Sequence, residues 1–155
     1  EGFGGGTINH AWSGGPLTIM SQYFAGIAPT APGFSSYSVM PQMGSLGKIQ
    51  TKVVTPKGDI ALELSNTQES FSMKLTSPAG TQATVGVPIP PSGSIAEVKV
   101  NGQPIWSQGK AETAPPGVRF VEANPRYLVF AVDPGQWTFL AALQQPSPSP
   151  TDSKL

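Results

Sequence analysis

The stretch "GKIQTKVVTPKGDIALELS", residues 47–65, decides the fold. Two runs rich in Val, Ile and Leu flank the turn-forming sequence "TPKGD", a pattern typical of two β-strands joined by a turn. In the second run, Ile60, Leu62 and Leu64 alternate with other residues, and this alternation places them on one face of a strand. The stretch therefore predicts β-structure, with an apolar face on the second strand.

Further runs of this kind occupy the rest of the chain from Tyr37 onward. They are "YSVMP", "SFSMKLTS", "QATVGVPI", "AEVKVNGQPIW", "VRFVE", "RYLVFAV" and "GQWTFLAAL", and turn formers such as "SPAGT", "PPSGS" and "DPGQ" separate them. Asn101 and Gly102 predict a two-residue hairpin, because both tolerate the positive φ angles of a type I′ turn. Eight or nine strands at intervals of about ten residues, without helices between them, predict a mainly β protein, an antiparallel β-sandwich.

One α-helix is predicted before the strands, within "SGGPLTIMSQYFAGIAPTAPG", residues 13–33. Pro16 suits the first helical turn, where its missing N–H would be unpaired in any case. Gly26 can end the helix in a left-handed conformation, and Pro29 prevents its continuation. Helical spacing places a stripe of apolar side chains on one face of this helix: Leu17, Met20, Phe24 and Ile27.

This helix lacks the polar face that a helix exposed to water carries. No charged side chain occurs between Gly2 and Gly47, so another surface is expected to cover the stripe. That surface is either the sandwich itself or a second copy of the chain, which makes a homodimer through the helix an expectation. The predicted organisation is a loop and helix at residues 1–34, a sandwich at 35–143 and a disordered Pro/Ser-rich tail at 144–155.

The composition excludes several classes of function. The 155 residues carry nine basic and nine acidic side chains and only 12% charged residues, so no basic stripe is available for nucleic acid. The apolar runs are far shorter than a membrane span, which argues against membrane insertion. Cysteine is absent, which excludes a disulfide framework and thiol catalysis. No charged-then-apolar leader opens the chain, so an exported protein would have lost its signal before this numbering begins.

Catalytic constellations are not evident in the sequence. His10 is the only histidine, and a lone histidine with scattered carboxylates has no metal-ligand spacing, so no metal or cofactor is predicted. The Gly-rich "GFGGGT" lacks the Gly-Lys-Ser/Thr of a phosphate-binding loop. The carboxylates that could form a glycosidase pair lie in strands and turns dense with Lys and Thr and are interpreted as solvated: Asp59, Glu63, Glu69, Glu97, Glu112, Glu122 and Asp133.

Aromatic residues of the strands allow two interpretations. Trp106, Tyr127 and Trp137 could form a platform on which sugars stack. Aromatic side chains in sandwich strands more often belong to the core, and both interpretations stay open at this point.

Several local motifs resemble one known family. Asn9–His10 precedes the predicted helix, Pro32–Gly33–Phe34 follows it, and "PQMGSL" (41–46), "GDI" (58–60) and "VKVNGQPI" (98–105) lie in the predicted sandwich. This arrangement resembles the C-terminal part of family 78 α-L-rhamnosidases of fungal and bacterial type. In that family an Asn-His pair lies before the last helix of a catalytic (α/α)₆ barrel, and a Pro-Gly-aromatic loop leads into a C-terminal β-sandwich.

The resemblance has consequences for each part of the chain. It implies that residues 1–34 are the remnant of a barrel end, and that His10 is a sugar-contacting residue at the barrel mouth. Asn9 and Trp12, its neighbours, are the other candidate sugar contacts. The catalytic acid and base of the family lie in the barrel, before the Asn-His pair, so the resemblance implies that this chain contains neither.

The leading hypothesis is a non-catalytic, extracellular β-sandwich module that binds a carbohydrate or a cell surface. Three alternatives stay open. The chain could be a fragment of an α-L-rhamnosidase whose catalytic barrel is missing, or a secreted interaction or immunomodulatory protein. It could also be a hydrolase that uses His10 and a strand carboxylate.

Overall fold

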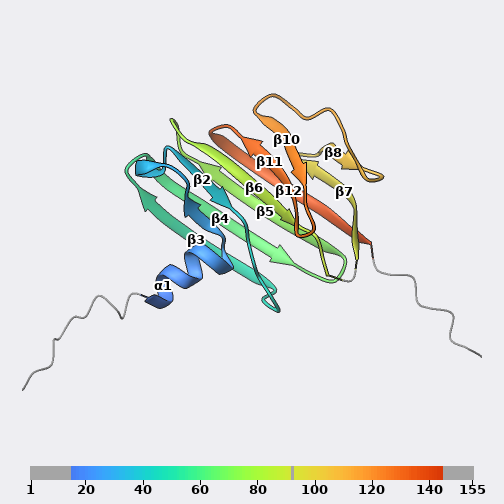
Figure 1. Cartoon of the computed structure of the whole chain (residues 1–155), viewed down its shortest axis with the longest axis horizontal. Coiled ribbons are helices and arrows are strands. Elements are labelled where there is room, and N and C mark those ends of the chain that lie inside the picture. Colours follow the sequence, from blue (N-terminus) through green and yellow to red (C-terminus); the bar gives the residue numbers. More distant parts are fainter. Residues whose placement is uncertain (1–14, 92, 145–155) are drawn as a thin grey trace, which may run out of the picture.

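Two packed β-sheets make up most of the molecule (Figure 1). The computed structural model describes residues 15–91 and 93–144. The candidate sugar contacts Asn9, His10 and Trp12 lie outside these residues, as does the tail from residue 145 onward. Within the described residues, no helix is long and apolar enough to cross a membrane.

The smaller sheet has five strands in the order β1-β2-β6-β11-β10. These strands are β1 (Ile27–Pro29), β2 (Ser36–Val39), β6 (Gln82–Pro88), β11 (Tyr127–Val132) and β10 (Val118–Ala123). Its neighbours are antiparallel except for β2 and β6, which pair in parallel with Ser36 opposite Gln82 and Val39 opposite Val85. The expected antiparallel sandwich thus contains one parallel pair, because β3, β4 and β5 intervene in the chain and return it to the start of β6.

The larger sheet has seven strands in the order β3-β4-β5-β12-β7-β8-β9, all antiparallel to their neighbours. These strands are β3 (Lys48–Thr55), β4 (Gly58–Asn66), β5 (Ser70–Ser77), β12 (Gly135–Gln144), β7 (Ser94–Val100), β8 (Gln103–Ser107) and β9 (Lys110–Ala111). The predicted mainly β sandwich is confirmed.

The predicted strands and the predicted hairpin are present. Ile60, Leu62 and Leu64 are buried on one face of β4. Asn101 and Gly102 have φ angles of 48° and 86° and join β7 to β8. The described residues hold twelve strands rather than eight or nine. The predicted hairpin run contributes two of these strands, and β1 and β9 add strands that are too short to show alternation.

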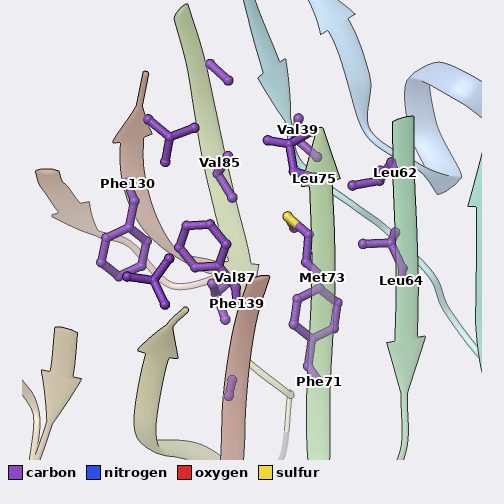
Figure 2. Packing of buried hydrophobic residues seen from close by; sticks show 14 of the residues in the cluster. Val39, Leu62, Leu64, Phe71, Met73, Leu75, Val85, Val87, Phe130 and Phe139 are labelled. Carbon is purple, nitrogen blue, oxygen red and sulfur yellow. The ribbon is translucent and has the colours of Figure 1, made fainter. Parts of the chain in front are cut away.

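The core lies between the two sheets. Figure 2 shows apolar side chains of β4 and β5 meeting those of β2, β6 and β11. Phe130 of the five-stranded sheet and Phe139 of the seven-stranded sheet are fully buried, with ring centroids 5.8 Å apart. Because apolar burial is the dominant favourable term in folding, this layer holds the sheets together.

A buried polar chain also connects the two sheets. The Tyr37 hydroxyl of β2 donates a hydrogen bond of 2.7 Å to Ser77 Oγ of β5. The Ser77 and Thr81 hydroxyls are 3.0 Å apart, and the Thr81 hydroxyl donates to the Pro78 carbonyl at 2.7 Å. Each hydroxyl therefore has a partner, and burial of Tyr37 costs no unsatisfied polar group. Burial raises the pKa of Tyr37, and the hydrogen bonds with Ser77 and Thr81 offset part of that rise.

The N-terminal helix is shorter than predicted. It consists of α1 (Gly15–Ile19) and a π-helical turn η2 (Met20–Phe24), and the 3₁₀ turn η3 (Pro32–Phe34) follows farther on. Gly26 has a φ of +75°, so it ends the helical segment as expected. The chain then enters β1, and Ile27 is buried in the sheet rather than placed on the helix stripe. The sheet therefore begins before the boundary expected at residue 35.

The other members of the predicted stripe lie at the surface. In Figure 1, α1 lies on the side of the molecule where β3 is the edge strand. Leu17 is 73% exposed, Met20 59% and Phe24 39%. The described part of the chain leaves this apolar surface largely uncovered.

Replacement of Gly26 by Ala is expected to destabilise the protein by several kcal/mol. A Cβ at this position would collide with the backbone carbonyl of Met40, and the positive φ adds strain. The control is Gly44→Ala, which has a similar φ of +56° but no atom within 4 Å of the added Cβ. Its cost is expected to be about 1 kcal/mol. Urea denaturation measures both, and equal costs would contradict the close contact between Gly26 and Met40.

Replacement of Tyr37 by Phe is expected to cost about 1–2 kcal/mol, because the Ser77 hydroxyl loses its buried donor. The raised pKa of Tyr37 means that its contribution is fully present below pH ~10 and is lost as the pH rises through the pKa in the folded state. The difference in free energy of unfolding between wild type and Tyr37→Phe should therefore shrink above pH ~10. Tyr23→Phe, at an exposed tyrosine, is the control with no expected effect, and a pH-independent difference would contradict the assignment.

Candidate functional site

A cavity of about 510 Å³ opens at one end of the sandwich. Strand ends and loops from both sheets line it: Pro41, Gln42, Met43, Gly44, Asn66, Phe71, Pro88, Ile89, Pro90, Pro91, Arg126, Tyr127 and Leu143. These residues are far apart in the sequence and meet because β4, β5, β6, β11 and β12 all have an end here. Its volume lies in the range of small-molecule sites, roughly 300–1,000 Å³.

The deepest lining residues belong to the hydrophobic core. Phe71 is 2% exposed and Met43 is 5% exposed, and both are part of the main cluster of buried side chains. Leu143 packs against that cluster. The floor of the cavity is therefore apolar and closely packed, which suits the C–H surface of a ligand.

The rim combines flat apolar rings with polar side chains. The apolar rings belong to four prolines, which have no backbone N–H to donate: Pro41, Pro88, Pro90 and Pro91. Gln42, Asn66 and Arg126 contribute amide and guanidinium groups. Amides can both donate and accept, so the cavity can hydrogen-bond hydroxyl groups of a ligand as well as contact its apolar surface.

Tyr127 holds one wall of the cavity in place. Its hydroxyl donates a hydrogen bond of 3.0 Å to the Pro41 carbonyl, which ties β11 to the loop after β2. Its ring lies against Gly86, where an added Cβ would come within 2.8 Å of Tyr127 Cδ1. Burial raises the pKa of Tyr127, and the neighbouring positive charge of Arg126 offsets part of that rise. The phenol therefore stays protonated at neutral pH and acts as a donor.

The turn before β11 is fixed by the side chain of Asn124. Its Oδ1 accepts hydrogen bonds from the backbone N–H groups of Arg126 at 3.0 Å and Tyr127 at 2.9 Å. The Arg126 carbonyl accepts the N–H of Ile89 at 2.8 Å, which attaches the proline-rich segment to the same turn. The rim is thus ordered before any ligand binds.

The structure does not bring the three candidate platform residues together. Only Tyr127 lines the cavity. Trp106 packs against Phe120, with ring centroids 5.4 Å apart, at the edge of the core. Trp137 donates from Nε1 to the Asp133 carbonyl at 2.8 Å. It lies six residues before Leu143 in β12, which separates it from the cavity by roughly 20 Å.

Three carboxylates of the strands form ion pairs with lysines at the surface. Lys52 contacts Asp59 at 2.9 Å, Lys74 contacts Glu63 at 3.9 Å and Lys99 contacts Glu97 at 2.9 Å, all with substantially exposed side chains. None of these residues lines the cavity. Among residues 15–91 and 93–144, no group of three or more His, Cys, Asp or Glu could hold a metal ion.

Sequence reasoning missed most of the cavity. Gln42, Asn66 and Arg126 lie in separate parts of the chain, and no local pattern connects them. The available signals were the proline cluster "PIPP" at residues 88–91 and the "NPR" turn directly before Tyr127. Both mark irregular backbone between strands, where binding residues are concentrated.

Comparisons with known proteins relate the first part of the sandwich to a known family of domains. Residues 26–102 match the family described as "Bacterial alpha-L-rhamnosidase C-terminal domain". No curated protein sequence matches the chain.

Two solved structures share the fold. An alpha-L-rhamnosidase from Dictyoglumus thermophilum is 22% identical, with a TM-score of 0.71 over 86% of this chain and 14% of that chain. A Streptomyces avermitilis alpha-L-rhamnosidase, solved with L-rhamnose, is 21% identical, with a TM-score of 0.62 over 83% of this chain and 11% of that chain. The chain thus spans only a small part of the length of either enzyme.

Replacement of Gly86 by Ala is expected to displace both Met40 Sδ, 2.5 Å from the added Cβ, and the Tyr127 ring, and to destabilise the protein by about 1–3 kcal/mol. Gly15→Ala, where an added Cβ meets nothing within 4 Å, is the control without such a cost. If the effect acts through the ring, Gly86→Ala should cost less in a Tyr127→Ala background. Urea denaturation of the four combinations measures this coupling, and strictly additive costs would contradict it.

Proposed function

We propose that the chain, whose residues 26–102 match the family of bacterial alpha-L-rhamnosidase C-terminal domains, is an accessory β-sandwich that binds carbohydrate. The proposed site is the cavity at the end of the sandwich, and the proposed role is recognition without hydrolysis. An extracellular location, where glycans are accessible, is part of the same proposal.

The composition of the cavity is the observation that carries this proposal. A pyranose has an apolar C–H face and a rim of hydroxyl groups, and protein sites for it combine flat apolar surfaces with planar polar groups. Tyr127, Phe71 and the proline rings provide the first kind of surface. Gln42 and Asn66 provide amides for the hydroxyls.

The order of the rim supports binding as well. Hydrogen bonds to Asn124 Oδ1, the Arg126 carbonyl and the Pro41 carbonyl hold the three segments around the opening. A ligand therefore loses little free energy to the ordering of loops, which favours affinity at a modest contact area.

Recognition is favoured over hydrolysis by the chemistry of the lining. Glycoside hydrolysis generally requires two carboxyl groups flanking the scissile bond. The described residues that line the cavity include no Asp or Glu. The proposed module therefore holds a sugar without cleaving it.

A second candidate function is that of one part of a larger alpha-L-rhamnosidase. The chain spans 14% and 11% of the two enzymes that share its fold, and Leu17 and Met20 of the helical segment are largely exposed. In that case the rest of the enzyme covers this apolar surface. A reading frame upstream of Glu1 that continues into a large catalytic region would favour this candidate.

Concentration-dependent dimers in light scattering, abolished by Leu17→Glu, would instead favour a homodimer through the helix.

Glycan binding is expected to depend on Tyr127. On a glycan array and in calorimetric titration of the best ligand, Tyr127→Ala should weaken binding about five- to thirtyfold, since a ring that stacks on a sugar contributes about 1–2 kcal/mol. Tyr23→Ala, at a tyrosine of the helical segment, is the matched control and should bind like the wild type. The same preparations should release no rhamnose from an aryl rhamnoside.

Two results would contradict the proposal. One is a folded wild-type chain that binds no glycan on the array. The other is binding that Tyr127→Ala leaves unchanged while Asn66→Ala and Gln42→Ala also have no effect, because the ligand would then lie outside the cavity.

A further inference from the structure

Arg126 is the charged residue among the described residues that line the cavity. Its side chain is exposed at the rim, while its backbone is held on both sides by Asn124 Oδ1 and the Ile89 N–H. The guanidinium therefore extends from a fixed point of the backbone at the opening.

The guanidinium has no ion-pair partner within the described part of the chain. The ion pairs found there use Lys52, Lys74 and Lys99. No acidic side chain lines the cavity among residues 15–91 and 93–144. A ligand that enters the cavity thus meets one uncompensated positive charge, next to the Tyr127 ring whose pKa it influences.

A guanidinium has a specific preference among anions. Its planar fork matches a carboxylate in a bidentate arrangement, and it is weakly hydrated, so it surrenders water readily. A single cation of this kind suits one carboxylate. Highly phosphorylated or sulfated polymers are instead bound by clusters of basic residues.

The remaining lining defines what carries the carboxylate. Phe71, Met43 and Leu143 form an apolar floor, which a free inorganic anion would leave unoccupied. A pyranose ring with a carboxylate on its C5 position presents a C–H face to such a floor, hydroxyl groups to the amides, and the anion at one edge. That ligand uses every kind of group in the cavity.

We infer that the cavity recognises a uronic acid residue of an acidic glycan, with its carboxylate on Arg126 and its ring against the Tyr127 side of the apolar floor. This inference rests on the proposed carbohydrate-binding function and adds the ligand class and the residue that selects it. Gln42 and Asn66 bind the hydroxyl groups, and Arg126 discriminates the acid from the neutral sugar.

The test uses two probes that differ only at their carboxyl groups, a trisaccharide of galacturonic acid and its fully methyl-esterified, uncharged form. The acid should bind about fivefold more tightly than the ester, because water screens a large part of the attraction to an exposed guanidinium. Arg126→Gln should remove this preference, because it weakens binding of the acid more than binding of the ester. Arg119→Gln, at an exposed arginine of β10 outside the cavity, should preserve the preference.

Salt provides a second readout. The affinity for the acid should fall as NaCl rises from about 20 to 300 mM, whereas the affinity for the ester should stay constant. Sodium acetate at the same carboxylate concentration should compete poorly, since it lacks the ring that contacts the floor. Far-UV circular dichroism and urea denaturation establish that both variants are folded.

The outcomes separate this inference from the function on which it rests. Equal affinities for acid and ester, unchanged by Arg126→Gln, would overturn the role of the carboxylate and leave carbohydrate binding in place. If acetate competes with an affinity equal to that of the trisaccharide, the assignment of a uronic acid ligand is overturned, and the cavity is a simple anion site. Failure of the folded chain to bind either probe would overturn the inference. An array without any bound glycan would overturn the proposed function as well.

Discussion

Two sheets exclude water from the layer between them, and strands such as β4 and β5 contribute alternate side chains to that layer. Ile60, Leu62 and Leu64 of β4 belong to the same buried cluster as Val85 and Val87 of β6. A shift of one residue in any of these strands would move its apolar set to the outer face. The register of the sandwich therefore follows from burial, and hydrogen bonds such as that between Tyr37 and Ser77 refine the position of one sheet over the other.

The cavity is a continuation of the same layer. At the end of the sandwich the strands stop, and proline-rich loops bridge the gap in place of further β-structure. Phe71 and Met43 belong to the core and to the floor of the cavity at once. A substitution at either residue would change stability and binding together, so the rim residues Gln42, Asn66 and Arg126 separate the two properties more cleanly.

Prediction from sequence succeeded where the physical signal is local. Alternation in "IALEL" and the Asn101–Gly102 turn each depend on a few adjacent residues. β1 and β9 have three and two strand residues, too few for a period of two to be visible, and Ile27 matched helical spacing although Gly26 ends the helix first. The cavity could not be predicted, because its polar residues come from three separate loops or strand ends. Trp106 and Trp137 are aromatic like Tyr127, but the topology places both of them outside the cavity.

The parallel pairing of β2 with β6 has a consequence for the order in which the chain assembles. Hairpins such as β3–β4, β4–β5 and β7–β8 join neighbours in sequence and can form rapidly. β2 can pair with β6 only after the three strands between them have crossed to the other sheet. Closure of so long a loop is entropically costly. Until it occurs, β6 presents a free edge of Val and Ala residues, to which strands of other chains can add.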